Sequence, residues 1–458
     1  MAEILKCADG SGNNKDSQKS LNPWQVLVFG FIGVIILGTI LLMTPYATND
    51  QNGLSFINAL FTATSAVCVT GLVVVDTGTF LAVPGQIVVM ILIQIGGLGI
   101  MTLATMMGII LGKKISLKER LLLQEALNQI SIQGLVKLVR YIVFMTIFFE
   151  AAGAVILSLR FSLTMSWEKA VYYGIFHSIS AFNNAGFDLM GNYTSLTGYT
   201  ADWIISLTIA VLFIIGGLGF VVIVELYQKK CSFSKLSLHS KVVLSTTAGL
   251  ALLGFLIILV FEYTNTFTLG SLRFDTKLLA SFFQGVTPRT AGFNTVDIAV
   301  MRMPTQFFII FLMFIGASPG STAGGIKTTT FAAAVIAIIN TIKGKENASL
   351  FERNLNKEII TKSFAIIGVA MFLVITTTMI LTITETADFL ALLFEATSAF
   401  GTVGLSMGIT PRLSLTGRII IIFTMFAGRV GPLTLAFALA RKKTEAKFQY
   451  PQEKIMIG

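Results

Sequence analysis

Charged residues are scarce in this chain of 458 residues. Asp, Glu, Lys and Arg together make up 12% of it, whereas hydrophobic residues make up 54%. A soluble domain could not hide that much apolar surface inside a core. The composition therefore excludes a soluble protein and predicts a chain that lies in lipid.

Histidine and cysteine are scarce as well. The two histidines, His177 and His239, lie far apart, and the three cysteines, Cys7, Cys68 and Cys231, have neither metal-site spacing nor an obvious pairing. These residues therefore indicate neither a metal site nor an acid–base enzyme. We interpret His177 as a packing residue of a short helix.

Long apolar runs fill the sequence instead. Charges are absent from residues 20–49, 77–112, 203–224, 242–261 and 363–384, and each run is long enough for the roughly 20 residues that span a bilayer. A sixth span near residues 135–159 carries Lys137, Arg140 and Glu150. Residues 303–342 and 415–440 complete a predicted set of eight transmembrane helices.

The cations gather between these runs. Segments 1–20, 113–134, 228–241, 343–362 and 441–458 hold 21 of the 33 Lys and Arg residues. Positive charge favours the cytoplasmic side, so these segments and both chain ends are predicted to be cytoplasmic, with the protein in the cell membrane. The clustering also accounts for the net charge of +10, so nucleic acid is not an expected partner.

Four short segments can be aligned without a gap. They are TSAVCVTGL (64–72), ISAFNNAGF (179–187), GVTPRTAGF (285–293) and TSAFGTVGL (397–405). Glycine holds position eight in all four, and Ser-Ala holds positions two and three in three of them. The spacings of 115, 106 and 112 residues are too long for a solenoid and predict four copies of one membrane-inserted unit around one axis.

Each unit reads as a span, a short apolar helix, a glycine segment and a second span. The short helices, near 55–66, 168–181, 276–286 and 388–399, are too brief to cross a bilayer, so we expect re-entrant loops that converge on a central cavity. Helix C-terminal ends at the cavity would favour a cation. Glycine would let successive carbonyls face one axis and replace the water shell of a monovalent cation. The alternative is a glycine that only closes a turn after a helix.

A second feature lies between Arg302 and Lys343, a stretch too long for one straight crossing. Its middle is rich in Gly, Pro, Ser and Thr, which break a helix. We expect this break to face the cavity below the filter as a gate, and a kink for packing is the alternative. The predicted gate comprises Gly316, Ala317, Ser318, Pro319, Gly320, Ser321, Thr322, Ala323, Gly324, Gly325, Lys327 and Arg429.

Arg429 is expected near mid-membrane, 11 residues after Arg418 and 12 before Arg441. A charge there costs roughly 2.5 to 3.5 kcal/mol on the insertion scale, so it should face a cavity or a partner. Two roles remain open. The guanidinium satisfies carbonyls of a pore helix or of the broken helix, or its charge stands in the cation path as a barrier. Lys327 raises the same question.

Together these motifs resemble the membrane subunit of the Trk/Ktr/HKT superfamily of cation transporters, most closely the bacterial Ktr type. The resemblance covers about residues 21–440 and rests on the glycine segments, IGGLG at 95–99 and 215–219, GASPGSTAGGIKT at 316–328 and FAGRVGPLT at 426–434. It implies a homodimer with one pore per protomer and a separate cytosolic ring of nucleotide-binding regulatory subunits. It also implies potassium as the ion, since Gly71 rather than serine stands in the first segment.

The residues predicted to form the selectivity filter, with potassium as the bound ion, occupy positions five to eight of the segments. They are Cys68, Val69, Thr70, Gly71, Asn183, Asn184, Ala185, Gly186, Arg289, Thr290, Ala291, Gly292, Gly401, Thr402, Val403 and Gly404.

Other motifs receive structural interpretations. GSTAGGIKT at 320–328 comes close to a phosphate-binding loop, but Ile326 separates the glycine from Lys327 and apolar runs flank it, so we expect no enzyme activity. Glu395 is interpreted as a structural carboxylate on the fourth short helix. The glycines of the two IGGLG motifs are expected to allow close helix contact.

The predicted fold is an all-α integral membrane protein. It has tails at 1–20 and 441–458, pore repeats at 21–112, 135–227, 242–342 and 363–440, and cytoplasmic linkers at 113–134, 228–241 and 343–362. We expect a gated, channel-like potassium conductor. Carriers usually place ionisable groups and inverted repeats around a midplane site, whereas the four repeats of this chain share one orientation and offer backbone at their shared positions. A sodium- or proton-coupled symporter is the alternative, and a passive sensor is a third class.

Overall fold

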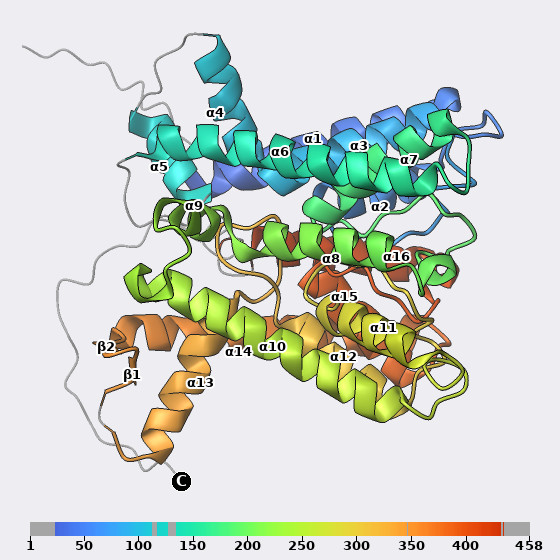
Figure 1. Ribbon diagram of the computed structural model, residues 1–458. Coiled ribbons are helices and arrows are strands. Elements are labelled where there is room, and N and C mark those ends of the chain that lie inside the picture. The colour runs from blue at the N-terminus through green and yellow to red at the C-terminus, as the bar shows by residue number, and fades with distance from the viewer. Residues whose placement is uncertain (1–22, 112–116, 127–133, 346, 432–433, 435–458) are drawn as a thin grey trace, which may run out of the picture.

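A computed structural model describes residues 23–111, 117–126, 134–345, 347–431 and 434. The predictions for tails 1–20 and 441–458, with Cys7, and for parts of the linker 113–134 and of residues 432–440 lie outside the described residues. Within them the chain is almost entirely helical (Figure 1).

Among the described residues, four long apolar helices form the frame and have the length and hydropathy to cross a bilayer. They are α1 (Pro23–Leu42), α6 (Leu135–Phe161), α10 (Leu238–Glu262) and α14 (Lys357–Thr384). At about 1.5 Å per residue, the 27 residues of α6 extend about 40 Å. Lys137 and Arg140 therefore lie near one end of α6, and Glu150 lies near its middle.

Four shorter helices lie inside this frame, close to the predicted positions. They are α2 (Phe56–Val67), α7 (Trp167–Phe182), α11 (Phe274–Val286) and α15 (Phe389–Gly401). Their C-terminal halves are almost completely buried; in α15 every residue from Phe394 to Gly401 is buried. Because each glycine segment begins within the C-terminal part of one of these helices, the segments start in the interior of the molecule.

Two further apolar runs are bent rather than straight. α3 (Val83–Leu98) and α4 (Ile100–Ile110) meet at 90°, and α8 (Trp203–Leu218) and α9 (Phe220–Gln228) meet at 96°. The bends lie at Gly99 and Gly219, with φ of 81° and 92°, a conformation that side chains with a Cβ rarely adopt. The expectation that these two glycines serve helix contact is therefore wrong: they form the bends.

The remaining helices complete the four quarters. α12 (Met303–Phe314) and α13 (Thr328–Ile342) are separated by the predicted break, and α16 (Leu415–Val430) ends at Gly431, where φ is 93°. If each bent pair counts as one span, up to six candidate spans meet the length and hydropathy criteria in the described residues. The total of eight crossings stays a prediction.

Small elements connect the helices. A two-stranded antiparallel hairpin of β1 (Ser349–Leu350) and β2 (Arg353–Asn354) lies in the linker 343–362, so the all-α expectation overlooked it. The others are α5 (Leu117–Ala126) and the 3₁₀ turns η1 (Pro45–Ala47), η2 (Thr197–Tyr199), η3 (Phe233–Lys235) and η4 (Thr410–Arg412). In Figure 1, α4, α13 and the hairpin lie at one end of the molecule, opposite the loops that precede the short helices.

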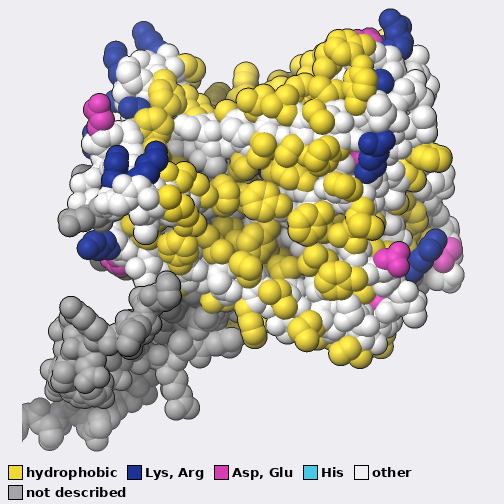
Figure 2. All heavy atoms as spheres, turned by 90° about the horizontal axis from the view of Figure 1, so that it is seen from below, with side chains coloured by type: hydrophobic (Ala, Val, Ile, Leu, Met, Phe, Trp, Pro, Cys, Tyr) yellow, Lys and Arg dark blue, Asp and Glu magenta, His cyan; other side chains and the backbone are white. Residues whose placement is uncertain are grey.

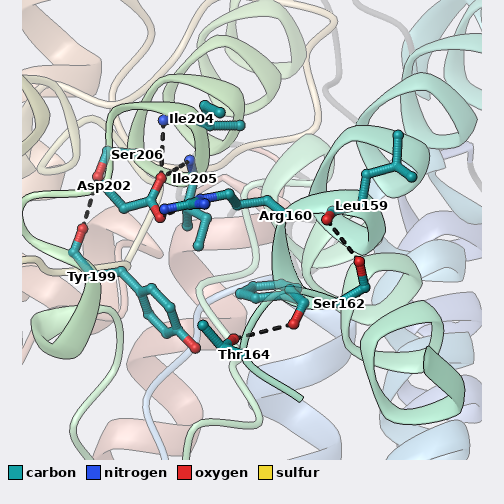
Figure 3. Close-up of polar contacts among 10 residues, drawn as sticks. Leu159, Arg160, Ser162, Thr164, Tyr199, Asp202, Ile204, Ile205 and Ser206 are labelled. Atoms are coloured by element: carbon teal, nitrogen blue, oxygen red, sulfur yellow. Dashed lines mark hydrogen bonds and ion pairs between the residues drawn. The ribbon is translucent and has the colours of Figure 1, made fainter. Parts of the chain in front are cut away.

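Polar contacts fix the joint between α6, the second long helix, and α8. Arg160 Nε at the end of α6 lies 2.6 Å from Asp202 Oδ2. Asp202 Oδ1 also caps α8 by accepting hydrogen bonds of 3.1 Å from Ile204 N and Ile205 N (Figure 3). One carboxylate therefore joins two helices and satisfies two free amides of a helix N-terminus.

Carboxylates close the corresponding joints of the next two quarters. Glu262, at the end of α10, accepts a hydrogen bond of 2.9 Å from Arg302 N, just before α12. Glu385, after α14, accepts one of 3.0 Å from Ser414 N, the N-cap of α16. The second, third and fourth quarters thus share this joint, although different residues stabilise it.

Hydrophobic side chains cover the middle of the face shown in Figure 2, and most charged side chains lie toward its two ends. Large apolar side chains are also exposed along the long helices, among them Phe144, Ile147 and Phe148 on α6 and Phe372 on α14. An apolar band between charged ends is the surface that a bilayer requires.

Candidate functional site

The four glycine segments have the same unusual backbone. At position eight the glycines have φ of 87° (Gly71), 70° (Gly186), 79° (Gly292) and 89° (Gly404). Position six is also left-handed, although no glycine stands there: φ is 56° at Val69, 58° at Asn184, 71° at Thr290 and 50° at Thr402. Left-handed residues at alternate positions let successive carbonyls face one side. Sequence analysis foresaw this conformation for the glycines but not for position six.

The segments meet one another in a closed order. A Cβ added to any of the four glycines would lie within 3.0 Å of backbone in the next quarter. The carbonyl oxygens so approached belong to Ala185 for Gly71, Ala291 for Gly186, Val403 for Gly292 and Thr70 for Gly404. Position eight of each segment therefore packs on position seven of the next, and the fourth segment returns to the first. The four segments form a ring.

Hydroxyl groups of the short helices hold the segments from behind. Ser65 Oγ accepts a hydrogen bond of 3.1 Å from Gly71 N, and Ser180 Oγ donates one of 2.6 Å to Phe187 O. Both serines belong to the repeated Ser-Ala pair. In the first two segments the hydroxyl at position two therefore reaches the backbone at position eight or nine, whereas Ser398 Oγ, at position two of the fourth segment, is buried without a hydrogen-bond partner.

Charged and polar side chains at position five point away from the ring. Asn183 Nδ2 lies 2.8 Å from Glu150 Oε1 on α6 and 3.0 Å from Gln94 Oε1 on α3. Arg289, a predicted filter residue, directs its guanidinium to α10, where Nη2 lies 3.3 Å from Thr247 Oγ1. At these positions only the backbone can take part in the ring.

Glu395 and His177 occupy equivalent places on two of the short helices. Glu395 is fully buried and accepts hydrogen bonds from Ser406 Oγ at 2.8 Å and from Thr410 Oγ1. His177 Nδ1 lies 2.7 Å from Tyr173 O, and its Nε2 accepts a hydrogen bond from Leu189 N at 3.4 Å. Both side chains link a short helix to the chain after its glycine segment, in agreement with their structural interpretation.

The predicted gate forms an irregular loop from Ile315 to Lys327 that lies against the other quarters. Ser318 N donates to Gly217 O at 3.1 Å, and Phe220 N donates to Gly320 O at 3.0 Å. Thr322 is fully buried, and its Oγ1 lies 3.0 Å from Asn184 Oδ1. The loop therefore contacts the second quarter at both its outer helix and its glycine segment.

Arg429 connects the loop to two quarters. Its guanidinium donates to Thr322 O of the loop through Nη1 and to Gly96 O of α3 through Nη2. The side chain thus binds backbone carbonyls, which is one of the two roles that the sequence left open. Its role as a barrier to cations stays a prediction. Lys327 Nζ donates to Ala323 O at 2.7 Å, within the loop itself.

The glycine motifs of the outer helices support the ring. A Cβ on Gly96, Gly216 or Gly428 would lie within 3.0 Å of the carbonyl oxygen at position four of the same quarter, on Val67, Phe182 or Phe400. Close contact, the predicted role, is therefore correct for Gly96 and Gly216. Arg429 follows Gly428 as Gly97 follows Gly96, so an overlay of AGRVG on IGGLG could have placed the arginine beside the ring.

Two carboxylates lie in the loops after the first and second segments. Asp76 Oδ2 accepts hydrogen bonds of 3.0 Å from Thr79 N and Asn192 N, which joins the two loops. Asp188 Oδ1 accepts one of 2.9 Å from Met190 N. Burial, with a smaller contribution from the charge of Asp76, raises the pKa of the Asp188 carboxyl to about 7.

Sequence reasoning missed several contributors to this site. The sequence analysis treated Gln94 and Glu150 only as members of predicted spans. It treated Asn184 and Thr402 only as sources of backbone carbonyls. A carboxylate in the middle of a long apolar helix is itself a signal, because it requires hydrogen-bond partners at that depth. Those partners could not be identified before the fold placed α3 beside α7.

Comparison with known proteins agrees with this arrangement. The sequence profile of the TrkH family, described as cation transport protein, matches residues 10–450. Ktr system potassium uptake protein B of Bacillus subtilis is 48% identical over 95% of this chain and 97% of its own length. The Vibrio alginolyticus protein of the same name is 42% identical over 97% and 96%. Potassium/sodium uptake protein NtpJ of Enterococcus hirae is 41% identical over 97% and 99%.

A solved structure has the same fold. The potassium transporter TrkH from Vibrio parahaemolyticus superposes with a TM-score of 0.71 over 93% of this chain and 86% of that chain, at 19% identity. The resemblance seen in the sequence motifs is thus confirmed along nearly the whole chain: it belongs to the TrkH family of cation transport proteins.

Proposed function

We propose that this chain conducts potassium into the cell, down its electrochemical gradient, through a filter of backbone carbonyls from its four glycine segments. The observation that carries the proposal is the closed ring of left-handed glycines. Each glycine packs on a carbonyl-bearing residue of the next quarter, so the four segments surround one axis. Carbonyl rings replace the hydration shell of monovalent cations.

Potassium is the ion of choice for two reasons. The relatives of highest identity reported above are potassium uptake proteins by name. The side chains at position five that carry charge or amide groups, Arg289 and Asn183, are engaged with α10 and with Glu150, which leaves main-chain oxygens to face the ion. Neutral oxygen ligands suit a weakly hydrated cation.

The loop 316–325 is the proposed gate, with Lys327 and Arg429. Arg429 donates to the loop carbonyl of Thr322, so its positive charge lies beside the loop and would oppose a cation there. Displacement of the loop would both clear the path and release the guanidinium from this carbonyl. Deleting several loop residues should therefore raise the flux sharply, and an unchanged flux would count against the gate.

Membership of the same family also supports a proposal for the oligomeric state, the topology and the regulatory partner of the chain. We propose a homodimer in the cell membrane, with eight crossings, four pore repeats and both chain ends in the cytoplasm. A cytosolic ring of nucleotide-binding subunits would regulate it, since the relatives are named as parts of a Ktr system. The linkers 228–241 and 343–362 would face this partner.

Cation flux into liposomes that contain the purified protein tests the proposal. Wild type should pass potassium in preference to sodium, and Gly71→Ser should lower that preference by about tenfold, equivalent to about 1.4 kcal/mol. The reason is that a Cβ at Gly71 would collide with Ala185 O of the second segment. Gly198→Ser is the matched control, because a Cβ at Gly198 meets nothing within 4 Å.

Two results would contradict the proposal. If Gly71→Ser kept the wild-type preference for potassium over sodium, the ring would not determine selectivity. Potassium uptake that stops without a sodium or proton gradient, at carrier-like rates, would establish the symporter instead.

A further inference from the structure

The loop between α12 and α13 is bonded to glycine segments on two opposite sides of the ring. On one side, Thr322 Oγ1 lies 3.0 Å from Asn184 Oδ1 of the second segment. On the other, Gly324 N donates to Thr402 Oγ1 of the fourth segment at 3.0 Å. Because the ring runs in the order one, two, three, four, these segments face each other across the axis. The loop therefore crosses beneath the ring.

Both contacts use the same position of their segments. Asn184 and Thr402 stand at position six, where the backbone is left-handed although the residue is not glycine. The equivalent Val69 has no polar side-chain atom. Thr290 Oγ1 is bonded to the carbonyl of Arg289 at 2.6 Å and lies 3.4 Å from Asn184 Nδ2, within the ring. Among the described residues, the side chains at position six thus form hydrogen bonds to the loop from the second and fourth segments only.

These contacts are buried. Thr322, Asn184 and Thr402 have 0% exposed surface, so no water can replace a partner that moves away while the site keeps this shape. A buried polar group left without a partner is unfavourable. In addition, a β-branched residue such as Thr402 is strained at positive φ and keeps that conformation only where its surroundings hold it. The loop is part of those surroundings.

We propose that Asn184 and Thr402 are positioning residues that latch the loop against the underside of the ring, so that opening of the loop also loosens the second and fourth filter segments. This inference rests on the proposed function, in which the ring is the filter and the loop the gate. Selectivity and gating are then coupled through two side chains, and a pore with a displaced loop is less selective than a closed one.

The variant pair Thr402→Val and Thr402→Ser tests the latch. Valine keeps the β-branched shape, which Val69 already adopts at this position, but removes the acceptor for Gly324 N. We expect Thr402→Val to raise the potassium flux into liposomes about fivefold, as loss of one hydrogen bond predicts, and to lower the preference for potassium over sodium. Thr402→Ser keeps Oγ and should give a flux below that of the valine variant. Thr382→Val, an exposed threonine of α14, is the matched control.

A deletion background separates the latch from a direct effect on the filter. In a chain that lacks residues 318–324, Thr402→Val has no loop to release, so it should add no further change in flux or selectivity. An equal change with and without the loop, or a wild-type flux for Thr402→Val, would overturn the latch.

The contact between Thr322 and Asn184 gives an independent variant, on the side of the loop. Thr322→Val removes the hydroxyl that faces Asn184, and it should reproduce the raised flux if Thr402→Val does not yield a monodisperse protein. A wild-type flux for Thr322→Val would then overturn the inference. Failure of the proposed function has a different signature, since the unaltered protein would then pass no potassium in preference to sodium.

Discussion

Individual residues around the ring keep their ionisable side chains behind the backbone rather than on its axis. Glu150 is met by the amides of Asn183 and Gln94, and Glu395 by two hydroxyls. The guanidinium of Arg289 is directed to Thr247 on α10. Such groups stabilise the backbone through hydrogen bonds, and each lost partner would leave a buried polar atom unsatisfied. The hydrogen bonds of these buried side chains support the shape of the ring.

Asp188 should make the free energy of unfolding depend on pH. Its pKa of about 7 in the folded chain lies above the ordinary 3.8, so the folded chain keeps a proton that the unfolded chain releases. Stability therefore falls as the pH rises between these values. Asp188→Asn cannot ionise, so its melting temperature should exceed that of wild type by an amount that grows from about pH 4 to about pH 7. Melting curves of both purified proteins measure this, and a difference independent of pH would refute it.

The sequence could identify those residues whose amino-acid type is dictated by the backbone conformation at their position. Gly71, Gly186, Gly292 and Gly404 combine a positive φ with backbone contact on the next quarter, and glycine alone tolerates both. Thr402 could not be identified in this way, because threonine rarely adopts a left-handed conformation and only its tertiary contacts hold it there.

At the scale of helices, hydropathy locates an apolar run but does not give its direction. The run 77–112 contains no charge, yet its chain turns by 90° at Gly99. The break after Phe314 was predictable, since glycine and proline are dense there. The bends at Gly99 and Gly219 each depend on a single glycine, which a helix can also carry without bending.

The two bends should respond differently to alanine. A Cβ at Gly99 meets only Thr102 Oγ1 at 4.0 Å, whereas a Cβ at Gly219 would lie 2.6 Å from Pro319 O in the loop. Both variants lose about 1 kcal/mol or more to the positive φ. Only Gly219→Ala should also displace the loop and raise the potassium flux in liposomes. Equal flux in the two variants would argue against contact between this bend and the gate.

The joint between α6 and α8 offers a second comparison. Asp202→Asn keeps a capping oxygen for Ile204 N and Ile205 N but loses the ion pair with Arg160, which is partly exposed and contributes little. Asp202→Ala loses the cap as well, at a cost of about 0.5 to 2 kcal/mol. The melting temperature should therefore fall from wild type to Asp202→Asn and again to Asp202→Ala. An asparagine variant less stable than the alanine variant would mean that the charge outweighs the cap.

At the scale of the whole molecule, one chain supplies every part of the ring, and the closest carbonyl that each glycine approaches belongs to the next quarter. This order makes neighbouring segments interdependent and leaves opposite segments without a direct glycine contact. Gly71 and Gly404 share one joint, since a Cβ at Gly404 would approach Thr70 O and lie 3.0 Å from Gly71 Cα. Gly71 and Gly292 share none.

Double-mutant cycles on the ratio of potassium to sodium flux test this order. The adjacent pair Gly71→Ala and Gly404→Ala should be non-additive, with a coupling of about 0.5 to 3 kcal/mol, because both changes disturb the same joint. The opposite pair Gly71→Ala and Gly292→Ala should be additive within about 0.5 kcal/mol if the segments act through neighbours. Gly33→Ala on α1, where a Cβ meets nothing within 4 Å, controls for glycine replacement as such. Coupling as strong across the axis as along the ring would mean that the four segments respond as one rigid unit, and the neighbour-to-neighbour order would then have no functional consequence.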